Sequence, residues 1–545
     1  MAPRTLTRLA VGYVILLGAV SLGLYARLAV NPDAAGHDLH LVTTWVAGQR
    51  TGRQVVPAAQ IPQTCGAGCT VAVDQIVDDA PVLSAHPWVL KFSLVPGRDG
   101  IQARFGEHTA YATPDDLVVW GAAAGHSHFG DANIMLGINN VHRALEQLAA
   151  ELGTSPDVLR AEGEIRRVVL RRGPGDQRQP WSQPLPLSEI TADRVRRGVM
   201  GAAHYLARHV RKDGEYNYQV DVATGRVTRG HSLPRRGIST WFLAEAAAYS
   251  RDPKLRAAAL RSATRFARHD TTDCGEHRCV SHGWQANLGS TATVVLAYAS
   301  LVESGLGPMF RAPMDSLVAF IRSQQRPDGE FHHYYDRKLR RPIDQQTQYV
   351  NGQAALALLL AYRIDKDPRN LQAAHRAIQY STGPGWDFFG SRYFFGNEHW
   401  TCQALQVLWA HAPNPDALDF CVRYQWFSRL MQREHGGYNL HPLHLTRVSD
   451  TGSRTESAGA TLVAARAAGL DAATLAPIEG QIRAAAGFLI GYQFMPGPAH
   501  LLYDPGAMRG GFPGSAVDLA VRIDLAQHAG AGILRYLEYL EGRGR

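Results

Sequence analysis

The sequence lacks the patterns that mark several large classes of protein. It has no long run of Lys and Arg interleaved with aromatic residues, although its formal net charge is +8. The basic residues are scattered, with only short groups such as Arg166–Arg167 and Arg340–Arg341. A nucleic-acid surface gathers its cations on one face, so we expect no nucleic-acid partner. The positive charge instead suits an anionic glycan or a membrane surface.

Cysteine is scarce, and its six residues fall in neighbouring pairs: Cys65 with Cys69, Cys274 with Cys279, and Cys402 with Cys421. Outside the cytosol, neighbouring cysteines in even number favour disulfides. The stretch CGEHRCVSH also offers His277 and His282 as zinc ligands, but its spacing matches no common zinc ribbon. We expect disulfides, and we expect neither a metal nor a cofactor.

Long apolar runs are also absent, except for one at the N-terminus. Leu9–Tyr25 carries no charge and follows Arg4 and Arg8. Its length is near the lower end of the roughly 17–25 residues of a membrane-spanning helix, and LYARLAV is a poor signal-peptide cleavage site. The basic residues before it favour a cytoplasmic N-terminus. We therefore expect an uncleaved single-pass anchor in the inner (cytoplasmic) membrane, with the bulk of the chain on the periplasmic or extracytoplasmic side.

Composition divides the chain behind this anchor, which we place at residues 1–30. Residues 31–60 are polar with small side chains, which is typical of a stalk. Residues 61–172 mix strand-like runs with one helix and predict a small α/β module. Residues 173–189 hold four prolines and predict a linker. Residues 190–541 are dominated by helical patterns.

Four segments define the predicted α/β module. Trp88–Val95 and Ile101–Ala112 predict strands on either side of the turn sequence PGRDG. Asn140–Leu152 has the apolar spacing of a helix, and Glu164–Arg172 predicts a returning strand.

A turn motif recurs in the helical region, as RKDGEYNY (211–218), QRPDGEFHH (325–333), QREHGGYN (432–439) and, more weakly, RGGFPGS (509–515). Apolar periodicity and Gly/Pro punctuation divide the region into six pairs of helices. The first helices begin near Ile190, Pro253, Arg311, Asp367, Pro415 and Thr474. The second helices begin near Gly237, Gly289, Tyr349, Glu398, Arg454 and Asp518. The links from first to second helix run to about 15–30 residues and are rich in aromatics, so we expect them to be functional.

Six helical pairs with their long loops on one face resemble an (α/α)6 toroid. The Q-x-x-D-G-x-[FY] turns are similar to those of terpene cyclases and protein prenyltransferases, and the layout is similar to that of six-hairpin glycosidases, polysaccharide lyases and sugar epimerases. The resemblance implies a mainly α fold whose second helices line a central funnel. The DxDD motif of the cyclases is absent. The resemblance therefore implies a carbohydrate-active enzyme for an envelope or exported polysaccharide or oligosaccharide.

Polar residues near the starts of the second helices are the candidate catalytic residues, namely Glu398, His399, Glu456, Asp524 and His528. A glycoside hydrolase needs two carboxylates, about 5–5.5 Å apart if retaining and about 6.5–9.5 Å apart if inverting. A uronate epimerase or lyase needs a base, an acid and a group that stabilises an enolate. We expect hydrolysis first, with the epimerase or lyase as the alternative. A non-catalytic toroid that serves as a scaffold or binding subunit is the alternative from a different class.

Aromatic and polar residues of the loops and helix starts form the candidate substrate-binding set, because aromatic faces bind the apolar faces of sugar rings. The set is Tyr216, Trp284, Tyr335, Asp344, Tyr349, Trp386, Trp400, Arg454 and Arg522.

The stretch VRIDLAQH (521–528) allows two interpretations. On a helix Arg522 and Asp524 point about 200° apart, so both serve one site only if the helix begins there. The structural interpretation predicts that Arg522 reaches a neighbouring helix, with Glu456 as its partner. In the active-site interpretation Asp524 and His528 share a face and can pair. Glu456 itself also fits a capping box headed by Ser453.

Overall fold

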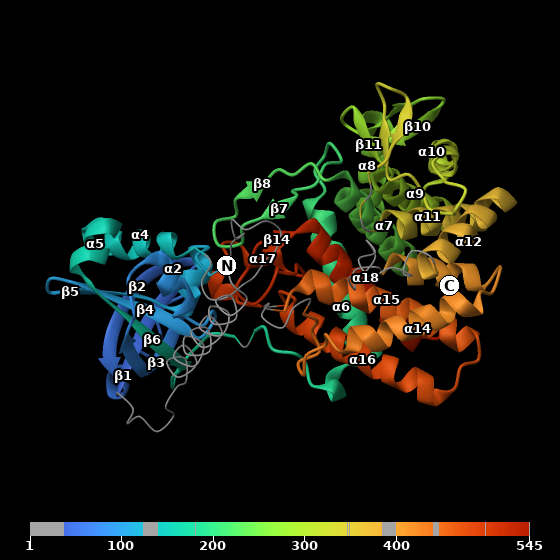
Figure 1. The fold of residues 1–545 in the computed structure, drawn as a ribbon. Coiled ribbons are helices and arrows are strands. Elements are labelled where there is room, and N and C mark those ends of the chain that lie inside the picture. The colour runs from blue at the N-terminus through green and yellow to red at the C-terminus, as the bar shows by residue number, and fades with distance from the viewer. Residues whose placement is uncertain are drawn as a thin grey trace, which may run out of the picture. The chain divides into compact units, whose positions relative to one another are not determined.

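The computed structural model describes residues 38–123, 140–179, 181–345, 347, 349–383, 399–439, 446–495 and 497–543 (Figure 1). The chain divides into two compact units. The α/β unit takes the chain up to Gln179 together with 498–503 and 516–519, and the helical unit takes the remainder. The predicted anchor, Leu9–Tyr25, lies outside the described residues. Within the described ranges, no helix combines the length and the apolarity needed to span a bilayer.

The α/β unit is built on one antiparallel sheet in the order β2-β1-β3-β6-β4-β5. Its strands are β1 (Leu39–Val46), β2 (Gln49–Pro57), β3 (Cys69–Pro81), β4 (Asp99–Phe105), β5 (His108–Ala112) and β6 (Glu164–Arg172). Its helices are α2 (Pro87–Phe92), α3 (Pro114–Val119), α4 (Val141–Glu151) and α5 (Pro156–Glu162). The predicted helix over Asn140–Leu152 and the predicted strand over Glu164–Arg172 are confirmed as α4 and β6.

Three predictions for this unit were wrong in detail. The segment expected to be a stalk, 31–60, instead contributes β1 and β2. The sequence of β2 is polar because β2 is the edge strand of the sheet and is largely exposed. Trp88–Val95 contains helix α2 rather than a strand, and Pro87 stands at its first position, where proline favours a helix. Ile101–Ala112 is a hairpin of β4 and β5 that turns at Gly106, whose φ is 59°.

The helical unit contains the six predicted pairs. The first, outer helices are α6 (Ala192–His209), α8 (Pro253–Arg265), α10 (Arg311–Ser323), α12 (Pro368–Thr382), α14 (Pro415–Arg429) and α16 (Ala472–Tyr492). The second, inner helices are α7 (Leu233–Ser250), α9 (Leu288–Glu303), α11 (Val350–Asp365), α13 (Trp400–Trp409), α15 (Val448–Ala467) and α18 (Ile523–Leu540). The largest differences from the predicted starts are at α15 and α18, which were expected to begin near Arg454 and Asp518.

The inner helices form a closed ring. Each contacts the inner helix before and after it, and α18 contacts α7 as well as α15. Helices such as α9 are buried on nearly every side, as expected for apolar helices within a core. The outer helices carry their apolar stripes toward this ring, and α16 contacts α6 to complete the outer layer.

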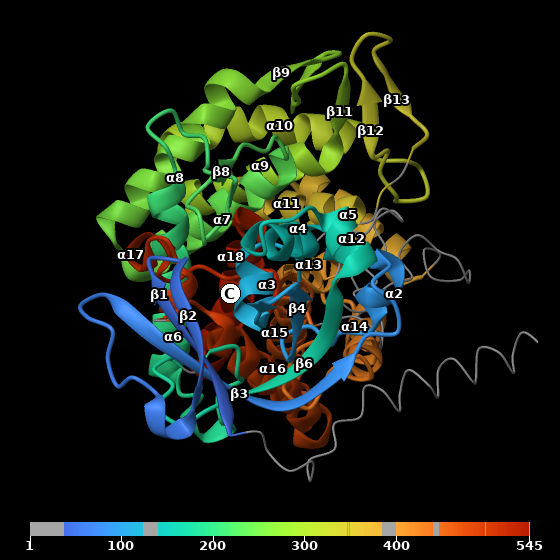
Figure 2. The same cartoon turned by 90° about the vertical axis from the view of Figure 1, so that its left-hand side faces the viewer.

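The long links of the helical unit contain short strands. β14 (Val521–Arg522), β7 (Gln219–Val220) and β8 (Val227–Thr228) form one sheet. β9 (Thr271–Cys274) pairs with β10 (His277–Val280), and β11 (Gln285–Asn287) pairs with β12 (Tyr334–Asp336), which pairs with β13 (Arg341–Ile343). Figure 2 shows the β12–β13 hairpin at the edge of the helical unit. A short helix, α17 (Pro505–Met508), precedes the last link.

The recurring turn motif joins neighbouring outer helices. Gln325 donates from Nε2 to the carbonyl of Gly329 at 3.1 Å and to that of Ala373 on α12 at 2.7 Å. Gln432 repeats this with Gly436 and with Gln481 on α16, both at 2.9 Å. The weak fourth copy forms the same two hydrogen bonds: Gln493 donates to Gly510 at 3.0 Å and to Gly198 on α6 at 2.9 Å. The motif is therefore a structural clamp rather than part of a reaction centre.

All six cysteines form the expected disulfides. Cys402–Cys421 joins α13 to α14, and Cys274–Cys279 closes the β9–β10 hairpin. The alternative zinc site does not form, since both sulfurs are oxidised and His282 pairs with Asp270 at 2.6 Å.

Candidate active site

Three polar side chains from neighbouring inner helices lie close together. His399 immediately precedes α13, Glu456 lies in the third turn of α15, and His528 lies in the second turn of α18. His528 Nδ1 is 2.9 Å from Glu456 Oε1, and His399 Nε2 is 3.8 Å from Glu456 Oε2. The two imidazole centroids are 5.4 Å apart with their planes at 79°. We call these three residues the His–Glu–His cluster.

Small residues bring the helices of this cluster together. A Cβ on Gly452 of α15 would lie 2.5 Å from the backbone carbon of His528, and one on Gly532 of α18 would lie 2.8 Å from the carbonyl oxygen of Gly452. Only glycine permits this backbone approach. The close contact of α15 with α18 is what places Glu456 within hydrogen-bond reach of His528.

Glu456 is fully buried and held by several donors. Besides His528, Gln403 donates to Oε2 at 3.0 Å and Gln527 donates to Oε1 at 3.4 Å. A buried carboxylate is stable only when paired and hydrogen-bonded in this way. Glu456 therefore acts as a fixed negative charge between the two imidazoles.

The charge on Glu456 controls the protonation of His528. Burial disfavours the imidazolium, but the attraction of Glu456 and its hydrogen bond outweigh this, and Asp524 adds to them, so the pKa of His528 lies above its usual value. His528 thus holds its proton to a higher pH than an imidazole in water.

A second charged group surrounds Asp524 at the start of α18. Arg522 donates to it from Nε at 2.5 Å and from Nη2 at 2.9 Å, and Arg235 Nε lies 3.0 Å from Oδ2. Burial raises the pKa of Asp524, but the attraction of Arg522 and Arg235 brings it below its usual value. We call Arg235 and Arg522 the arginine pair, and Asp524 is the carboxylate that they share.

Two solved structures have the same architecture as the helical unit. One is a D-mannose isomerase, with 12% identity, a TM-score of 0.50, and alignment of 65% of this chain to 98% of that one. The other is the cellobiose 2-epimerase of Bacillus thermoamylovorans B4167, with 11% identity, a TM-score of 0.51, and alignment of 64% of this chain to 99% of that one. The helical unit is an (α/α)6 toroid. No protein-family model and no curated protein matched the chain, and likeness at this identity shows the fold alone.

The toroid places part of the predicted catalytic set together. His399, Glu456 and His528 form the cluster. Asp524 lies one helical turn before His528 and is ion-paired with the arginine pair. Glu398 lies outside the described residues. His528 hydrogen-bonds to Glu456 rather than to Asp524.

Two interpretations of single residues were wrong. Arg522 pairs with Asp524 and not with Glu456, because α18 begins at Ile523 and leaves Arg522 in β14, free to fold back. Ser453 does not cap a helix, because α15 begins five residues earlier, at Val448.

Four members of the predicted substrate-binding set lie in the core of the toroid: Tyr216, Tyr335, Trp400 and Arg454. The Tyr216 hydroxyl bonds Thr240 Oγ1 at 3.1 Å, and burial raises its pKa to about 12. Trp400 packs on Trp241 with ring centroids 5.9 Å apart. These four side chains pack within the core, as His399 and Glu456 also do, so their part in substrate binding stays a prediction.

The remaining members differ in their surroundings. Tyr349 precedes α11 with φ at 77°, and its ring centroid is 6.3 Å from that of His399. A left-handed backbone at a tyrosine costs roughly 1–3 kcal/mol and often marks a functional site. Trp284 and Asp344 are exposed. Trp386 lies outside the described residues.

Sequence reasoning missed Gln403, Gln527 and Arg235, which support the two charged groups. Each lies in a polar stretch at an inner helix start, in NEHWTCQ, VRIDLAQH and RRGIST. The sequence feature that could have identified them is a polar side chain on an otherwise apolar inner helix.

The ligand atoms of the His–Glu–His cluster lie within 4.8 Å of one another, so these residues could hold a metal ion. Two histidines and a glutamate are a known zinc ligand set. Here, however, both Glu456 oxygens already accept hydrogen bonds, from His528, Gln403 and Gln527. The observed arrangement is that of a hydrogen-bonded acid–base group.

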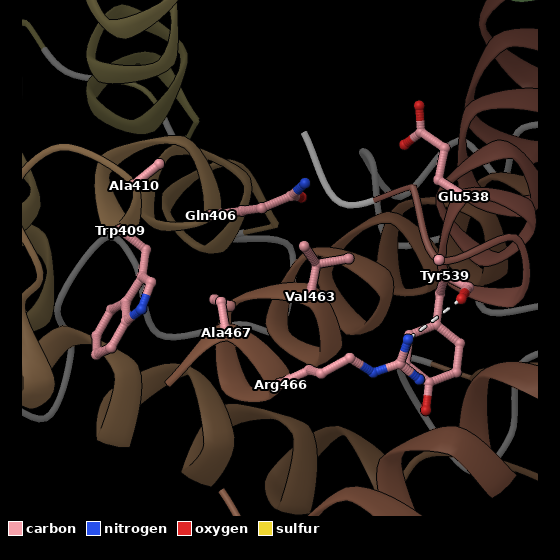
Figure 3. A pocket seen from close by; sticks show the side chains of 10 residues that line it. Gln406, Trp409, Ala410, Val463, Arg466, Ala467, Glu538 and Tyr539 are labelled. Carbon is pink, nitrogen blue, oxygen red and sulfur yellow. Dashed lines mark hydrogen bonds between the residues drawn. The ribbon is translucent and has the colours of Figure 1, made fainter. Parts of the chain in front are cut away.

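A cavity of about 310 Å³ lies elsewhere in the toroid (Figure 3). Its lining includes Trp409 of α13, Val463 and Arg466 of α15, and Glu538 and Tyr539 of α18. All of these residues are near the C-terminal ends of their helices, whereas the cluster is near the N-terminal ends. This cavity is therefore separate from the candidate active site.

Proposed function

We propose that the toroid is a sugar epimerase or isomerase that moves a proton at an acidic carbon of a sugar, next to a carbonyl or carboxyl group. The observation that carries the proposal is the pair of imidazoles held by the single buried carboxylate of Glu456. Imidazole is the side chain best suited to general acid–base catalysis near neutral pH. An isomerase and a 2-epimerase have the same fold, but the proposal rests on the cluster, because fold does not fix function.

Hydrolysis, the first expectation from the sequence, has less support from the described carboxylates. Glycoside hydrolysis needs one carboxyl group as a proton donor and a second as a nucleophile or base. Glu456 is saturated with hydrogen bonds, and Asp524 is ion-paired to two guanidinium groups. Neither carboxylate is poised for those tasks.

The two histidines take different roles in the proposed reaction. His528, kept protonated by Glu456, donates its proton to the carbonyl oxygen of the substrate. His399 removes the proton from the neighbouring carbon, and the released electron pair forms the carbon–carbon double bond of an enediol. His399 then gives its proton back to the enediol. Delivery to the other face of the same carbon, after the enediol turns over in the site, gives the epimer, and delivery to the adjacent carbon gives the isomer. In both cases His528 takes back a proton from the oxygen that becomes the carbonyl of the product.

The proposed setting is extracytoplasmic, with the chain anchored through Leu9–Tyr25. Three disulfides support it, because such bonds persist mainly outside the cytosol. The proposed substrate is an envelope or exported polysaccharide or an oligosaccharide derived from it.

Deuterium exchange tests the reaction directly. We expect the protein to introduce deuterium from D2O at one ring carbon of its substrate, detected by NMR across a panel of reducing sugars and uronates. His528→Asn and His399→Asn should each slow this exchange by roughly 10²–10⁴-fold, as is typical for loss of a general acid or base. His375→Asn, a change on outer helix α12, is the matched control. Treatment with EDTA should leave the rate unchanged.

The opposing result is equally clear. Release of new reducing ends from envelope glycan, without deuterium at any ring carbon, would establish a hydrolase and overturn the proposal.

A further inference from the structure

Two guanidinium groups share one carboxylate beside the cluster. Arg235 comes from the first turn of α7, Arg522 from β14, and Asp524 from the first turn of α18. The three charges sum to one net positive charge. The Arg235 side chain is 40% exposed, against 7% for Asp524. Arg235 uses Nε for Asp524 and Nη1 for the Tyr218 hydroxyl, at 2.5 Å, and its Nη2 bonds no described residue.

Asp524 carries one negative charge against the two guanidinium groups beside it. Arg235, the more exposed of the two arginines, adds positive charge where the backbone already provides positive potential, because α7 and α18 both begin there. Arg522 lies on β14, which forms a small sheet with β7 and β8 (Figure 1). Arg226 and Arg229 near β8 are exposed and form no ion pair with the described residues.

The arginine pair lies one helical turn from the His–Glu–His cluster. Asp524 and His528 are four residues apart on α18 and share a face, which corresponds to a rise of about 6 Å along the helix. Both Asp524 and Arg235 act electrostatically on His528. This separation is comparable to the width of a sugar ring, so a single sugar unit can reach both groups.

We propose that Arg235 and Arg522 bind a carboxylate of the substrate, so that the sugar is a hexuronate unit rather than a neutral hexose. Guanidinium groups match carboxylates through charge and paired N–H donors. The inference rests on the proposed function for the identity of the reaction, but the binding it describes requires no turnover.

Binding of two matched probes tests the inference. D-glucuronate and D-glucose differ only at C6, where one has a carboxylate and the other a hydroxymethyl group. Their affinities are measured by calorimetry on the full chain carrying His528→Asn, so that neither is consumed, and are repeated on the unsubstituted protein. We expect glucuronate to bind at least tenfold more tightly than glucose and this preference to weaken as salt is added.

Substitutions at the three charges carry opposite expectations. Arg235→Gln and Arg522→Gln should each weaken glucuronate binding about tenfold or more while leaving glucose binding unchanged. Asp524→Asn should strengthen glucuronate binding, because it removes the carboxylate that competes for the same guanidinium groups. Arg226→Gln, which removes a charge near the same sheet, should change the affinity less than about twofold.

Two results would overturn the inference. One is equal affinity for glucuronate and glucose. The other is a loss of glucuronate binding in Asp524→Asn as large as that in Arg235→Gln, because a purely structural cluster fails whichever member is removed. Thermal unfolding of each variant establishes that it is folded. Deuterium exchange confined to neutral sugars would reject the anion site and retain the proposed reaction, and charge-dependent glucuronate binding without exchange would do the reverse.

Discussion

Glu456 raises the pKa of the His528 imidazole. Its carboxylate lies in a dry environment and hydrogen-bonds to His528, which keeps the proton on that ring. Gln403 and Gln527 fix the carboxylate from both sides. Glu456 is thus a positioning residue that acts through His528, and its effect should be visible in the pH dependence of the reaction.

Glu456→Gln should move the alkaline limb of the pH–rate profile to lower pH. The negative charge of Glu456 raises the pKa of His528, so a neutral amide lowers that pKa, and the acid form is lost earlier as pH rises. The rate above neutral pH should fall about tenfold for each unit by which the pKa falls. The measurement is the rate of deuterium exchange between pH 5 and 9. An alkaline limb that stays in place would show that His528 is not the acid.

For single residues, the sequence predicts the position along an inner helix better than the direction in which the side chain points. His399, Glu456 and His528 were predicted because they stand near the starts of inner helices, and position along a repeat can be read from periodicity. Trp400 and Arg454 stand at similar positions but do not join the cluster, since side-chain direction depends on where each helix begins. For α15 that start differs by six residues from the predicted one, at Val448 rather than Arg454.

The elements of the toroid are joined by the repeated turn clamp. Its glycines adopt positive φ and lie against the next outer helix: Gly436 has φ at 88°, and a Cβ there would lie 2.1 Å from the carbonyl oxygen of Ala484 on α16. The recurrence of the turn thus has a structural explanation. The recurrence follows from how helical pairs pack in a ring.

Gly436→Ala should destabilise the toroid by about 1–3 kcal/mol, through backbone strain and displacement of α16. Gly480→Ala is the control on α16 itself, where no heavy atom lies within 4 Å of the added Cβ. It should stabilise the protein by about 0.5–1 kcal/mol, since alanine is the better helix former. Urea denaturation measures both. Equal effects of the two substitutions would reject the clamp.

The fourth clamp shows where element-level prediction fails. Its glutamine, Gln493, and its glycine, Gly510, are 17 positions apart, against four in the copies that begin at Gln325 and Gln432. Residues 498–503, which belong to the α/β unit, interrupt it. A motif search relies on fixed spacing, whereas hydrogen-bond geometry tolerates an excursion of the chain between the two partners.

At the scale of the whole molecule, the repeat predicts six pairs but contains no information on how the ring closes. Closure depends on contacts between the two ends of the toroid, of α18 with α7 and of α16 with α6. Gln493 provides one of these contacts through Gly198. Arg535 provides another: it donates from Nη2 to Glu245 Oε1 of α7 at 2.6 Å and from Nη1 to Glu538 of α18 at 2.8 Å, with all three side chains buried.

Arg535→Leu should therefore lower the free energy of unfolding of the toroid by about 3–5 kcal/mol, because it removes the guanidinium that ion-pairs with two buried carboxylates. Acid reduces the negative charge that this substitution leaves in the core, so the deficit should shrink as pH falls from 8 to 5. Arg543→Leu, which removes an exposed arginine beyond the end of the same helix and leaves its partner Glu541 paired with Arg196, should cost less than about 1 kcal/mol. Replacing Glu245, Arg535 and Glu538 together with leucine should restore most of the lost stability, since no charge is then left unpaired in the core. Denaturant unfolding at the two pH values, followed by tryptophan fluorescence, measures all three variants. If Arg535→Leu behaves like Arg543→Leu at both pH values, this ion pair does not hold the ring closed.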